Sequence, residues 1–595
     1  MKMQLYTRKN IDFILHDVLE VEELCKNDYF KNHSKETFDL VLDMADEVSK
    51  KTSLPAFVDS DRNQPALTDG HVKVHSGLHA FTKAYADAGM IASTFDESFG
   101  GQQLPKTIYA ATEYVGMCAH NSFMMFTDLA NGCSNLIATF GNQEQKELYI
   151  PKLLSAEWLS SMCLTEPQAG SSLSEITTKA SPQINGTFKI SGQKVFISAG
   201  DHDITPNIVH LVLARIEGAP AGVKGISLFI VPKNRVEDLS QSNDVTSIGI
   251  FHKMGQKATP AMHLAFGAND NCEGYLLGEA NQGLTQMFKM MNGARLGVGM
   301  TGIACASAAY HHSLQYSKER IQGKRLDLNQ KAASVAIVEH PDVRRMLLRQ
   351  KAIVEGGLAF MLQCYFYIDQ IRLKPERKSQ YDTLLELLTP VAKTFGAEMG
   401  IVSVNQGLQV LGGYGYTEDF PLEQLARDVR ICSIYEGTTG IQSLALLGRE
   451  VFRNDKIALK LWHSEVQETL ELSNEIKELQ AFVEEFKQKL NIFDKLNEHL
   501  EKISGEGNSE IFLKDATAYM EMFGLLNVAW QWLKMAQIAQ LKISIINAED
   551  NFYKSKIQTM KFFFKYELSR VNNLSEILFQ NDTLTIFDPN NEILV

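Results

Sequence analysis

The chain has 595 residues, too many for one hydrophobic core of ordinary size, so two to four domains are expected. Its 58 Lys and Arg against 71 Asp and Glu give a net charge of −13, which argues against a nucleic-acid surface, because phosphate binding draws mainly on positive charge. The eight cysteines show no CxxC pair and no His-clustered metal spacing, so we predict no metal site and a reduced, cytoplasmic setting.

The N-terminal 35 residues are predicted to be an extension that precedes the first domain. Its apolar patch, Ile11 to Leu15, is broken by His16 and Asp17, so the segment lacks the apolar core of a signal peptide. The whole sequence contains no uninterrupted apolar run long enough to span a bilayer. We therefore predict a cytoplasmic protein and consider membrane association improbable.

The pattern of apolar residues predicts a mainly α-helical protein with a central β domain. Apolar residues recur at helical spacing over 36–158 and again over 281–450, where 296–322 and 384–411 are long amphipathic stretches. Between them, over 159–280, short β-branched runs are punctuated by Gly, Asn, Asp and Pro; they are 188–190, 194–197, 208–213, 226–231 and 262–266. No helices intervene between these runs, so a sandwich or barrel is favoured over a parallel sheet.

The glycine motif from Gly297 to Gly302 matches GxGxxG, but no strand precedes it. Gly and Ala at spacings of three and four residues suit close helix packing better than nucleotide binding. We interpret this motif as a packing face of a helix.

Residues 451–595 are predicted to form an additional helical domain, with helical segments near 458–503, 511–545 and 551–578. The last segment combines lysines with Phe562, Phe563 and Phe564, so it could lie on a membrane surface. An aromatic face packed on the rest of the protein, with its lysines in water, is the favoured alternative.

The turn from Ser433 to Gln442 places one carboxylate, Glu436, beside an aromatic residue and two threonines. Gly437 would let the backbone approach a ligand, and Thr438 could cap the helix that follows. Such a turn could set a general base at a helix entrance. Taken alone, the decapeptide is as well explained by a helix-capping turn with a solvated glutamate.

Four motifs in order resemble the acyl-CoA dehydrogenase family, flavoenzymes that desaturate acyl-CoA thioesters. They read TEPQAGSS from Thr165, KVFISAG from Lys194, YSKERIQGK from Tyr316, and QVLGGYGY, RD and IYEGTTGIQ between Gln409 and Gln442. The chain departs from the family pattern at Gln168, which replaces a glycine, and after Gln322, where a phenylalanine is missing. An inserted stretch at 324–335 resembles a long bacterial subgroup that includes 3-methylmercaptopropionyl-CoA dehydrogenases.

The resemblance implies that FAD is the cofactor and that an acyl-CoA becomes a trans-2-enoyl-CoA, with Glu436 removing the α-proton. Some relatives carry this base elsewhere, at the position of Ala294, which cannot serve. The implied FAD contacts, several of them across a dimer interface, are Met162, Leu164, Thr165, Ser171, Phe196, Ser198, Arg320, Gln322, Gln409, Gly412, Gly413 and Thr438. The implied substrate contacts are Ser171, Arg295, Tyr435 and Gly437.

The family resemblance also implies a homodimer or homotetramer and electron-transferring flavoprotein as the electron acceptor. Two alternatives remain open at this point. An acyl-CoA oxidase has a similar fold and base but passes electrons to oxygen, and some family-like flavoproteins bind nucleic acid, although the acidic composition opposes that reading. The sequence does not indicate the length of the acyl chain.

Overall fold

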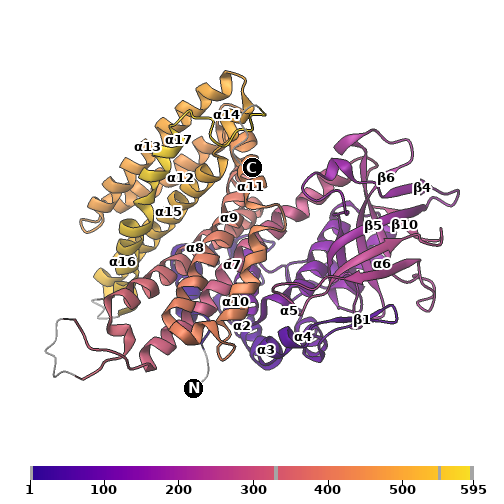
Figure 1. Ribbon diagram of the computed structural model, residues 1–595, viewed down its shortest axis with the longest axis horizontal. Helices are drawn as coiled ribbons and strands as arrows, with labels where there is room; N and C mark the ends of the chain where they lie inside the picture. The colour runs from indigo at the N-terminus through magenta and orange to yellow at the C-terminus, as the bar shows by residue number, and fades with distance from the viewer. Residues whose placement is uncertain (1–3, 327–332, 547–550, 590–595) are drawn as a thin grey trace. The chain divides into compact units, whose positions relative to one another are not determined.

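A computed structural model describes residues 4–326, 333–546 and 551–589 (Figure 1). Residues 327–332 of the predicted insertion and residues 1–3 of the predicted extension lie outside this part. The chain forms two compact units. The first, the helical unit, combines Met1–Leu24, Val298–Leu422 and Cys432–Val595; the second, the mixed unit, combines Cys25–Gly297 with Glu423–Ile431.

The helices of the mixed unit begin at recognisable caps. Ser34 and Thr37 form a reciprocal capping box at the first helix, and Asn142 and Gln145 form another at the last helix before the sheet. Main-chain geometry at His120, with φ −164° and ψ 88°, interrupts the longest of the helices that lie wholly in this unit. The helices before the sheet are α2 (Lys35–Val48), α3 (Phe57–Arg62), α4 (Ser76–Asp87), α5 (Lys106–Phe140) and α6 (Gln143–Leu154), and α10 (Leu422–Val429) belongs to this unit from Glu423 on. A small hairpin of β1 (Ala66–Thr68) and β2 (His71–Lys73), absent from our prediction, lies between α3 and α4.

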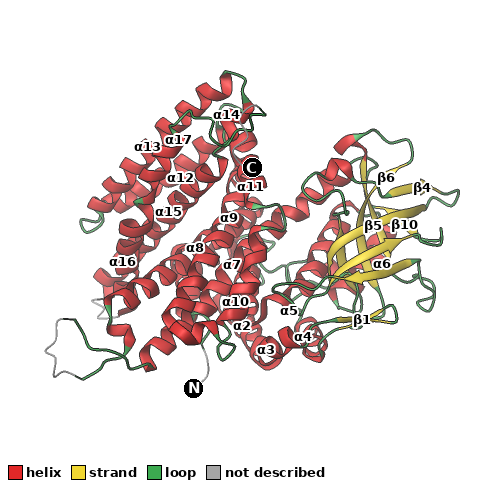
Figure 2. Ribbon diagram, viewed as in Figure 1, coloured by secondary structure: helices red, strands yellow, loops and turns green. Residues whose placement is uncertain are grey.

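An eight-stranded sheet follows these helices in the mixed unit and is drawn in yellow in Figure 2. Its strands are β3 (Leu159–Cys163), β4 (Lys179–Pro182), β5 (Phe188–Ser198), β6 (Ile208–Ile216), β7 (Ile226–Pro232), β8 (Val245–Ile250), β9 (Ala261–Phe266) and β10 (Glu273–Leu276). Their order is β10-β7-β6-β4-β5-β9-β8, and β10 also pairs with β5, so part of the sheet closes on itself. This closure confirms the predicted barrel-like or sandwich class. The two runs predicted at 188–190 and 194–197 are one strand, β5.

Most strand pairs are antiparallel, but β3 and β4 both pair with β6 in parallel. The register of β5 against β9 shifts between Lys194 and Ile197, which marks a β-bulge. The inner face of the sheet is filled by buried apolar side chains such as Ile190, Val212 and Phe229. This core holds both ends of β5 and therefore fixes where its bulge lies.

The helical unit is built from long helices joined by several short ones. They are α7 (Gly283–Glu319), of which the part from Val298 belongs to this unit, α8 (Pro341–Leu373), α9 (Lys378–Leu411), α11 (Thr439–Ala445), α12 (Ile457–Asn474), α13 (Gln480–Gly505), α14 (Ser509–Leu513), α15 (Ala516–Ile546), α16 (Asn551–Phe563) and α17 (Arg570–Leu578). The N-terminal helix α1 (Arg8–Asp12) and the turn after it pack here too, with Ile11, Ile14 and Leu15 buried. No helix in the described ranges is long and apolar enough to cross a membrane.

The GxGxxG motif lies within α7 and serves packing, as predicted. A Cβ at Gly299 would come 2.8 Å from the carbonyl oxygen of Ala392, and one at Gly302 would come 2.1 Å from that of Gly396. Gly396 in turn meets the carbonyl of Gly299. These distances show that α7 and α9 touch backbone to backbone, and they leave no room for a nucleotide.

The C-terminal helices pack on one another and on α8 and α9 within the helical unit (Figure 2). Trp462, Trp530 and Trp532 are buried, and Trp532 Nε1 donates a hydrogen bond of 3.1 Å to the carbonyl of Ala352 in α8. Phe562, Phe563 and Phe564 are buried as well. The aromatic face therefore packs inside the protein, as the favoured alternative predicted, but Lys556 is buried against Glu355 and does not lie in water. The first predicted C-terminal segment is divided into α12 and α13.

Candidate active site

The turn with Glu436 lies in the helical unit between a short 3-10 turn, Arg430–Ser433, and α11. Thr438 is the N-cap of α11, and its hydroxyl accepts a hydrogen bond of 3.2 Å from the amide of Ile441. The next residue, Thr439, donates from its hydroxyl to the carboxylate of Glu398 in α9. Thr438 therefore caps the helix as the sequence predicts, and the capped end of α11 fixes the position of the backbone next to Glu436.

Glu436 and Gly437 both adopt left-handed backbone conformations, with φ values of 55° and 86°. For an L-residue such as Glu436 this conformation costs about 1–2 kcal/mol, so the surrounding structure must stabilise it. At Gly437 a Cβ would also come 2.4 Å from Nε2 of Gln442. Glycine is therefore required at 437 for both its backbone angle and its space, and Glu436 is held in a strained geometry.

Two side chains hold the carbonyl groups of this turn. Gln442 Nε2 donates to the carbonyl of Glu436 at 2.9 Å, and Lys393 Nζ donates to the carbonyl of Gly437 at 2.8 Å. Gln442 belongs to α11, which directly follows the turn, whereas Lys393 comes from α9 and is fully buried. The turn is thus fixed from its own helix and from a distant one.

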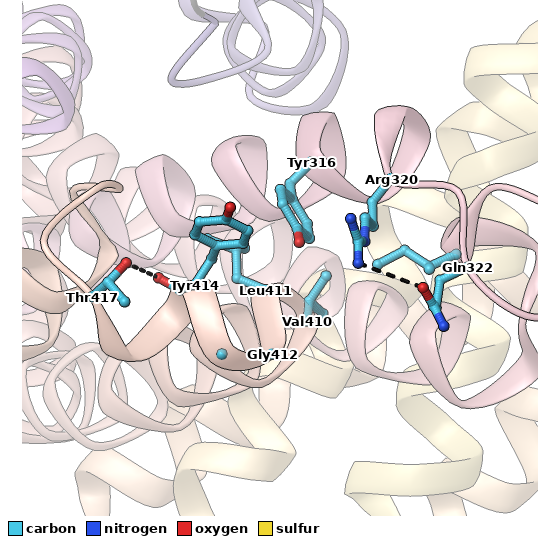
Figure 3. A pocket seen from close by; sticks show the side chains of 10 residues that line it. Tyr316, Arg320, Gln322, Val410, Leu411, Gly412, Tyr414 and Thr417 are labelled. Atoms are coloured by element: carbon cyan, nitrogen blue, oxygen red, sulfur yellow. Dashed lines mark hydrogen bonds between the residues drawn. The ribbon is translucent and has the colours of Figure 1, made fainter.

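A cavity of about 470 Å³ opens elsewhere in the helical unit, between the end of α7 and the end of α9 (Figure 3). Tyr316 extends into it from α7, and Arg320 and Gln322 follow directly after the end of that helix; Arg320 Nη2 lies 3.4 Å from Gln322 Oε1. The opposite wall is the turn that follows α9, including Gly412 and Gly413. The cavity thus brings together four predicted FAD contacts that are about ninety residues apart in sequence.

The cavity offers groups suited to a nucleotide. The guanidinium of Arg320 supplies positive charge for phosphate. The rings of Tyr316 and Tyr414, whose centroids lie 6.4 Å apart, supply apolar aromatic surface. The backbone of Gly412 and Gly413 is exposed and has no side chain, so a ligand can lie directly against it. Gln409 is exposed one residue before the lining residue Val410 and does not itself line the cavity. The residues present therefore fit part of a flavin nucleotide.

The loop after Arg320 is held by a short hairpin. Gln322 N donates to the carbonyl of Val335 at 3.0 Å, and Ile337 N donates to the carbonyl of Arg320 at 2.9 Å. His340 Nε2 lies 2.7 Å from the carbonyl of Gln322. The two ends of the inserted stretch thus lie beside the cavity, where these hydrogen bonds position Arg320 and Gln322.

In the mixed unit, the predicted cofactor loop follows β3. Glu166 is its anchor, with both carboxylate oxygens engaged: Thr177 and Thr178 each donate an amide and a hydroxyl, and Lys194 Nζ lies 2.9 Å away. Burial alone would raise the pKa of this carboxyl, but the charge of Lys194 and the threonine donors outweigh burial and bring the pKa to about 2. Gln168, the departure from the family pattern, also donates to Glu166 at 2.8 Å.

Lys194 connects this loop to the bulge of β5. Its ammonium also donates to the carbonyl of Leu164 at 3.0 Å, and Val195 N donates to the carbonyl of Thr165 at 2.9 Å. At the bulge Phe196 has φ 59°, and its side chain is 61% exposed and lies against Phe251 with ring centroids 4.4 Å apart. The loop and the exposed aromatic ring are therefore fixed relative to each other.

The other predicted contacts of the mixed unit occupy more ordinary surroundings. Ser198 and Met162 are half-buried, and Ser171 is exposed. Arg295, in α7, donates to Asn292 Oδ1 at 3.1 Å and lies 5.8 Å from the ring of Phe288. In the helical unit Tyr435 is half-buried. None of these geometries by itself assigns a ligand.

Sequence reasoning overlooked Glu166, Lys194, Lys393 and Gln442 as site residues. Glu166 and Lys194 lie inside motifs in which the hydroxyl and aromatic groups are the ones that indicate cofactor binding. Lys393 carried a usable signal, because it is a lone charge among the apolar residues Val391, Ala392 and Phe395 of a long helix. A charge at such a position requires a buried partner.

Comparison with known proteins follows the domain order of the chain. The N-terminal, middle and C-terminal domains of acyl-CoA dehydrogenase match residues 39–157, 161–268 and 281–451. The family described as acetyl-CoA dehydrogenase C-terminal like matches residues 462–586. The four matches follow one another along the chain and together span most of it, from residue 39 to residue 586.

Individual relatives cover most of the chain. The 3-methylmercaptopropionyl-CoA dehydrogenase of Ruegeria pomeroyi is 36% identical over 508 residues, 84% of this chain and 85% of the relative. A butyryl-CoA dehydrogenase of Syntrophomonas wolfei is 32% identical over 612 residues, 99% of both chains. The structure of an acyl-CoA dehydrogenase complexed with FAD from Bacillus anthracis matches with a TM-score of 0.74 at 20% identity, covering 92% of this chain and 88% of that one. The chain therefore belongs to the acyl-CoA dehydrogenase family, a family of oxidoreductases.

Proposed function

We propose that this protein is an FAD-dependent acyl-CoA dehydrogenase in which Glu436 removes the α-proton of the thioester. The observation that carries the proposal is the position of Glu436 on a strained, doubly held turn at the entrance of α11. The other position at which relatives carry the base is Ala294 here, and an alanine cannot accept a proton. Glu436 is therefore the base.

The proposed reaction requires a base and a hydrogen-bond donor from the turn. The carboxylate of Glu436 must reach the α-carbon, and a hydrogen-bond donor must stabilise the thioester oxygen as negative charge develops on it. The backbone amide of Glu436 serves as that donor in our proposal. The same residue therefore hydrogen-bonds the thioester oxygen and removes the α-proton. Bound FAD supplies the acceptor for the hydride that leaves the β-carbon.

Two sets of residues contact FAD in this proposal. In the helical unit, Arg320, Gln322, Gly412 and Gly413 line the cavity, and Gln409 and Thr438 complete the set. In the mixed unit, the set is Met162, Leu164, Thr165, Ser171, Phe196 and Ser198. Substrate contacts are Ser171, Arg295, Tyr435 and Gly437. The protein is a homodimer or homotetramer, with several FAD contacts supplied across its interface.

The names of two relatives indicate a class of acyl group for the substrate. Their names specify a methylthiopropanoyl and a butanoyl thioester, two acyl groups of similar length. We propose a short acyl-CoA for this protein, with electron-transferring flavoprotein as the electron acceptor. One methylene changes discrimination by only about 1–3 kcal/mol, so a panel from short to long chains is required.

The test is the replacement Glu436→Gln. Glutamine nearly preserves the volume and leaves the backbone amide in place, but its neutral side chain cannot accept the α-proton. Anaerobic mixing with acyl-CoA should bleach the flavin of the unmodified protein, while the variant binds acyl-CoA and stays oxidised, with a rate lower by at least about 10²–10⁴-fold. Glu468→Gln, an exposed change on α12, should behave like the unmodified protein. A variant at 436 that bleaches at the normal rate would place the base elsewhere.

A further inference from the structure

The Glu436 turn is held by a residue that lies more than forty positions away in the sequence. Lys393 is in the middle of α9, is fully inaccessible to solvent, and donates from Nζ to the carbonyl of Gly437 at 2.8 Å. The residue before Gly437 is the proposed base. A buried cation therefore contacts the backbone of the turn directly beside that base.

The contact fixes the orientation of a peptide plane. Because a trans peptide group is planar, its carbonyl and its amide point in opposite directions. Lys393 holds the carbonyl of Gly437, and Gln442 holds that of Glu436, so the two peptide planes after Glu436 are fixed in succession. Rotation of the first plane would change ψ of Glu436, and rotation of the second would change ψ of Gly437. Either movement would shift Glu436 relative to α11 and displace its carboxylate. The hydrogen bonds from Lys393 and Gln442 thus determine the orientation of the Glu436 carboxylate.

Packing alone does not account for a lysine at this position. The neighbours of Lys393 in α9, including Val391, Ala392 and Phe395, are buried and apolar, and a methionine would fill the same space. Burying an ammonium group is costly unless it is hydrogen-bonded. The hydrogen bond to the carbonyl of Gly437 is one interaction that offsets this cost and connects the lysine to the turn.

We propose that Lys393 is a positioning residue that holds the Glu436 turn in its reactive geometry. The proposal rests on the function proposed above, in which Glu436 is the base. Lys393 acts through the backbone of the turn and does not itself exchange a proton with the substrate. Its loss should therefore slow proton removal while leaving the binding of substrate and cofactor close to normal.

The experiment compares Lys393→Met with Lys534→Met. Lys534, in α15, makes a similar 2.8 Å hydrogen bond to Gln363 but lies away from the turn in sequence and contacts. Two quantities are measured: the dissociation constant of a non-reacting thioether analogue of the acyl-CoA, by calorimetry, and the rate of flavin bleaching at saturating acyl-CoA. We expect Lys393→Met to bind the analogue within about threefold and to bleach about 10–10²-fold more slowly, the loss that a displaced reacting group produces. Lys534→Met should bleach at the normal rate.

A double variant separates positioning from a general loss of structure. If Lys393 acts through Glu436, adding Lys393→Met to Glu436→Gln should produce little further loss of rate, because both changes remove the same contribution. Additive losses would overturn the proposal, as would a normal rate in Lys393→Met. If Lys393→Met does not fold, the same comparisons are made with Lys393→Gln, whose side chain keeps a neutral hydrogen-bond donor. Lys393→Gln should lose less of the bleaching rate than a variant without a donor. A normal bleaching rate in Glu436→Gln alone would instead contradict the proposed base.

Discussion

Lys194 Nζ and Glu166 Oε1 lie 2.9 Å apart in the mixed unit, and the two side chains are 0% and 1% exposed. This ion pair connects the bulge of β5 to the loop that follows β3. Burial lowers the pKa of Lys194, and the charge of Glu166 opposes that effect. The carboxylate has enough donors around it to remain ionised, so removal of the lysine would leave a buried negative charge without its cation.

We first predict that Lys194→Met destabilises the protein by about 3–5 kcal/mol, the usual cost of removing one partner of a buried pair. The variant should also retain less FAD, because Lys194 holds the carbonyl of Leu164 in the proposed cofactor loop. Lys189→Met, on the same strand, is the control: Lys189 pairs with Asp270 at the surface, where such pairs contribute about 0–1 kcal/mol. Urea unfolding and flavin absorbance measure the two effects. Equal stability of the two variants would contradict the prediction.

The second prediction concerns acid sensitivity. His210 is buried on β6, with Nδ1 2.7 Å from Ser161 Oγ, and burial, with a smaller contribution from Lys233, lowers its pKa to about 3. The unfolded chain takes up a proton near pH 6.5 but the folded chain does not, so stability is complete above pH 6.5 and is lost as the pH falls towards 3. Between pH 7.5 and 5 this one group should lower the free energy of unfolding by about 2 kcal/mol.

His210→Asn checks this prediction, because asparagine does not titrate. Its free energy of unfolding should fall less between pH 7.5 and 5 than that of the unmodified protein, by about 2 kcal/mol. His71→Asn, an exposed change on β2, should leave the pH dependence nearly unchanged. The two unfolding series need be compared only in their slopes with pH, so a constant loss of stability in the variant does not obscure the result. Parallel slopes would mean that His210 does not contribute.

Periodicity predicted the succession of helical, β and helical regions because each segment buries one face that shows in its residue spacing. The strands β1, β2, β4, β8 and β10 were not predicted; apart from the six-residue β8, each has only three or four residues, too few for a readable alternation. The break between α12 and α13 was also missed, because charged residues run through it without a proline. Local pattern thus predicts long elements and overlooks short ones.

The segment Glu423–Ile431 shows what local pattern cannot reveal. It follows α9 in sequence but belongs to the mixed unit, where Arg427 forms two hydrogen bonds, of 2.9 and 2.7 Å, with the carboxylate of Asp61. Asp428 accepts a hydrogen bond from Asn121 at 3.1 Å. These partners are more than three hundred residues away, so the Arg-Asp pair could be identified as a motif but not explained. The contact between Lys393 and the Glu436 turn spans only 44 residues, but local pattern does not reveal it either.

The third prediction concerns the attachment of the C-terminal helices. Gly356 in α8 faces Trp532 in α15, and a Cβ at 356 would lie 2.4 Å from Trp532 Nε1 and 2.7 Å from Val528 Cγ1. Gly356→Ala should therefore destabilise the protein by about 1–3 kcal/mol, the range for overpacked cores. Gly505→Ala in α13 meets no atom within 4 Å and should be neutral or slightly stabilising. Thermal unfolding distinguishes the two, and a stable Gly356→Ala would mean that α8 and α15 are less closely packed.

The fourth prediction separates backbone geometry from space in the wall of the cavity. Gly412 has φ 60° and ψ −132°, the mirror image of extended backbone, which only glycine adopts readily, whereas the φ of Gly413 is not positive. A Cβ at either position would meet no atom within 4 Å. The two alanine variants therefore differ in backbone strain and not in steric contact with the protein.

We expect Gly412→Ala to strain the turn by about 1–3 kcal/mol. The strain is relieved if the turn after α9 moves, and movement would displace the wall that faces Arg320 and Gln322, so FAD should bind more weakly. Gly413→Ala should affect FAD binding less, because its backbone can stay in place. Titration of the two apoproteins with FAD, followed by flavin fluorescence, measures the difference. If both variants bind FAD equally well, the conformation of Gly412 is not needed to shape the cavity; if Gly413→Ala is the weaker, the added methyl group occupies space that the cofactor requires.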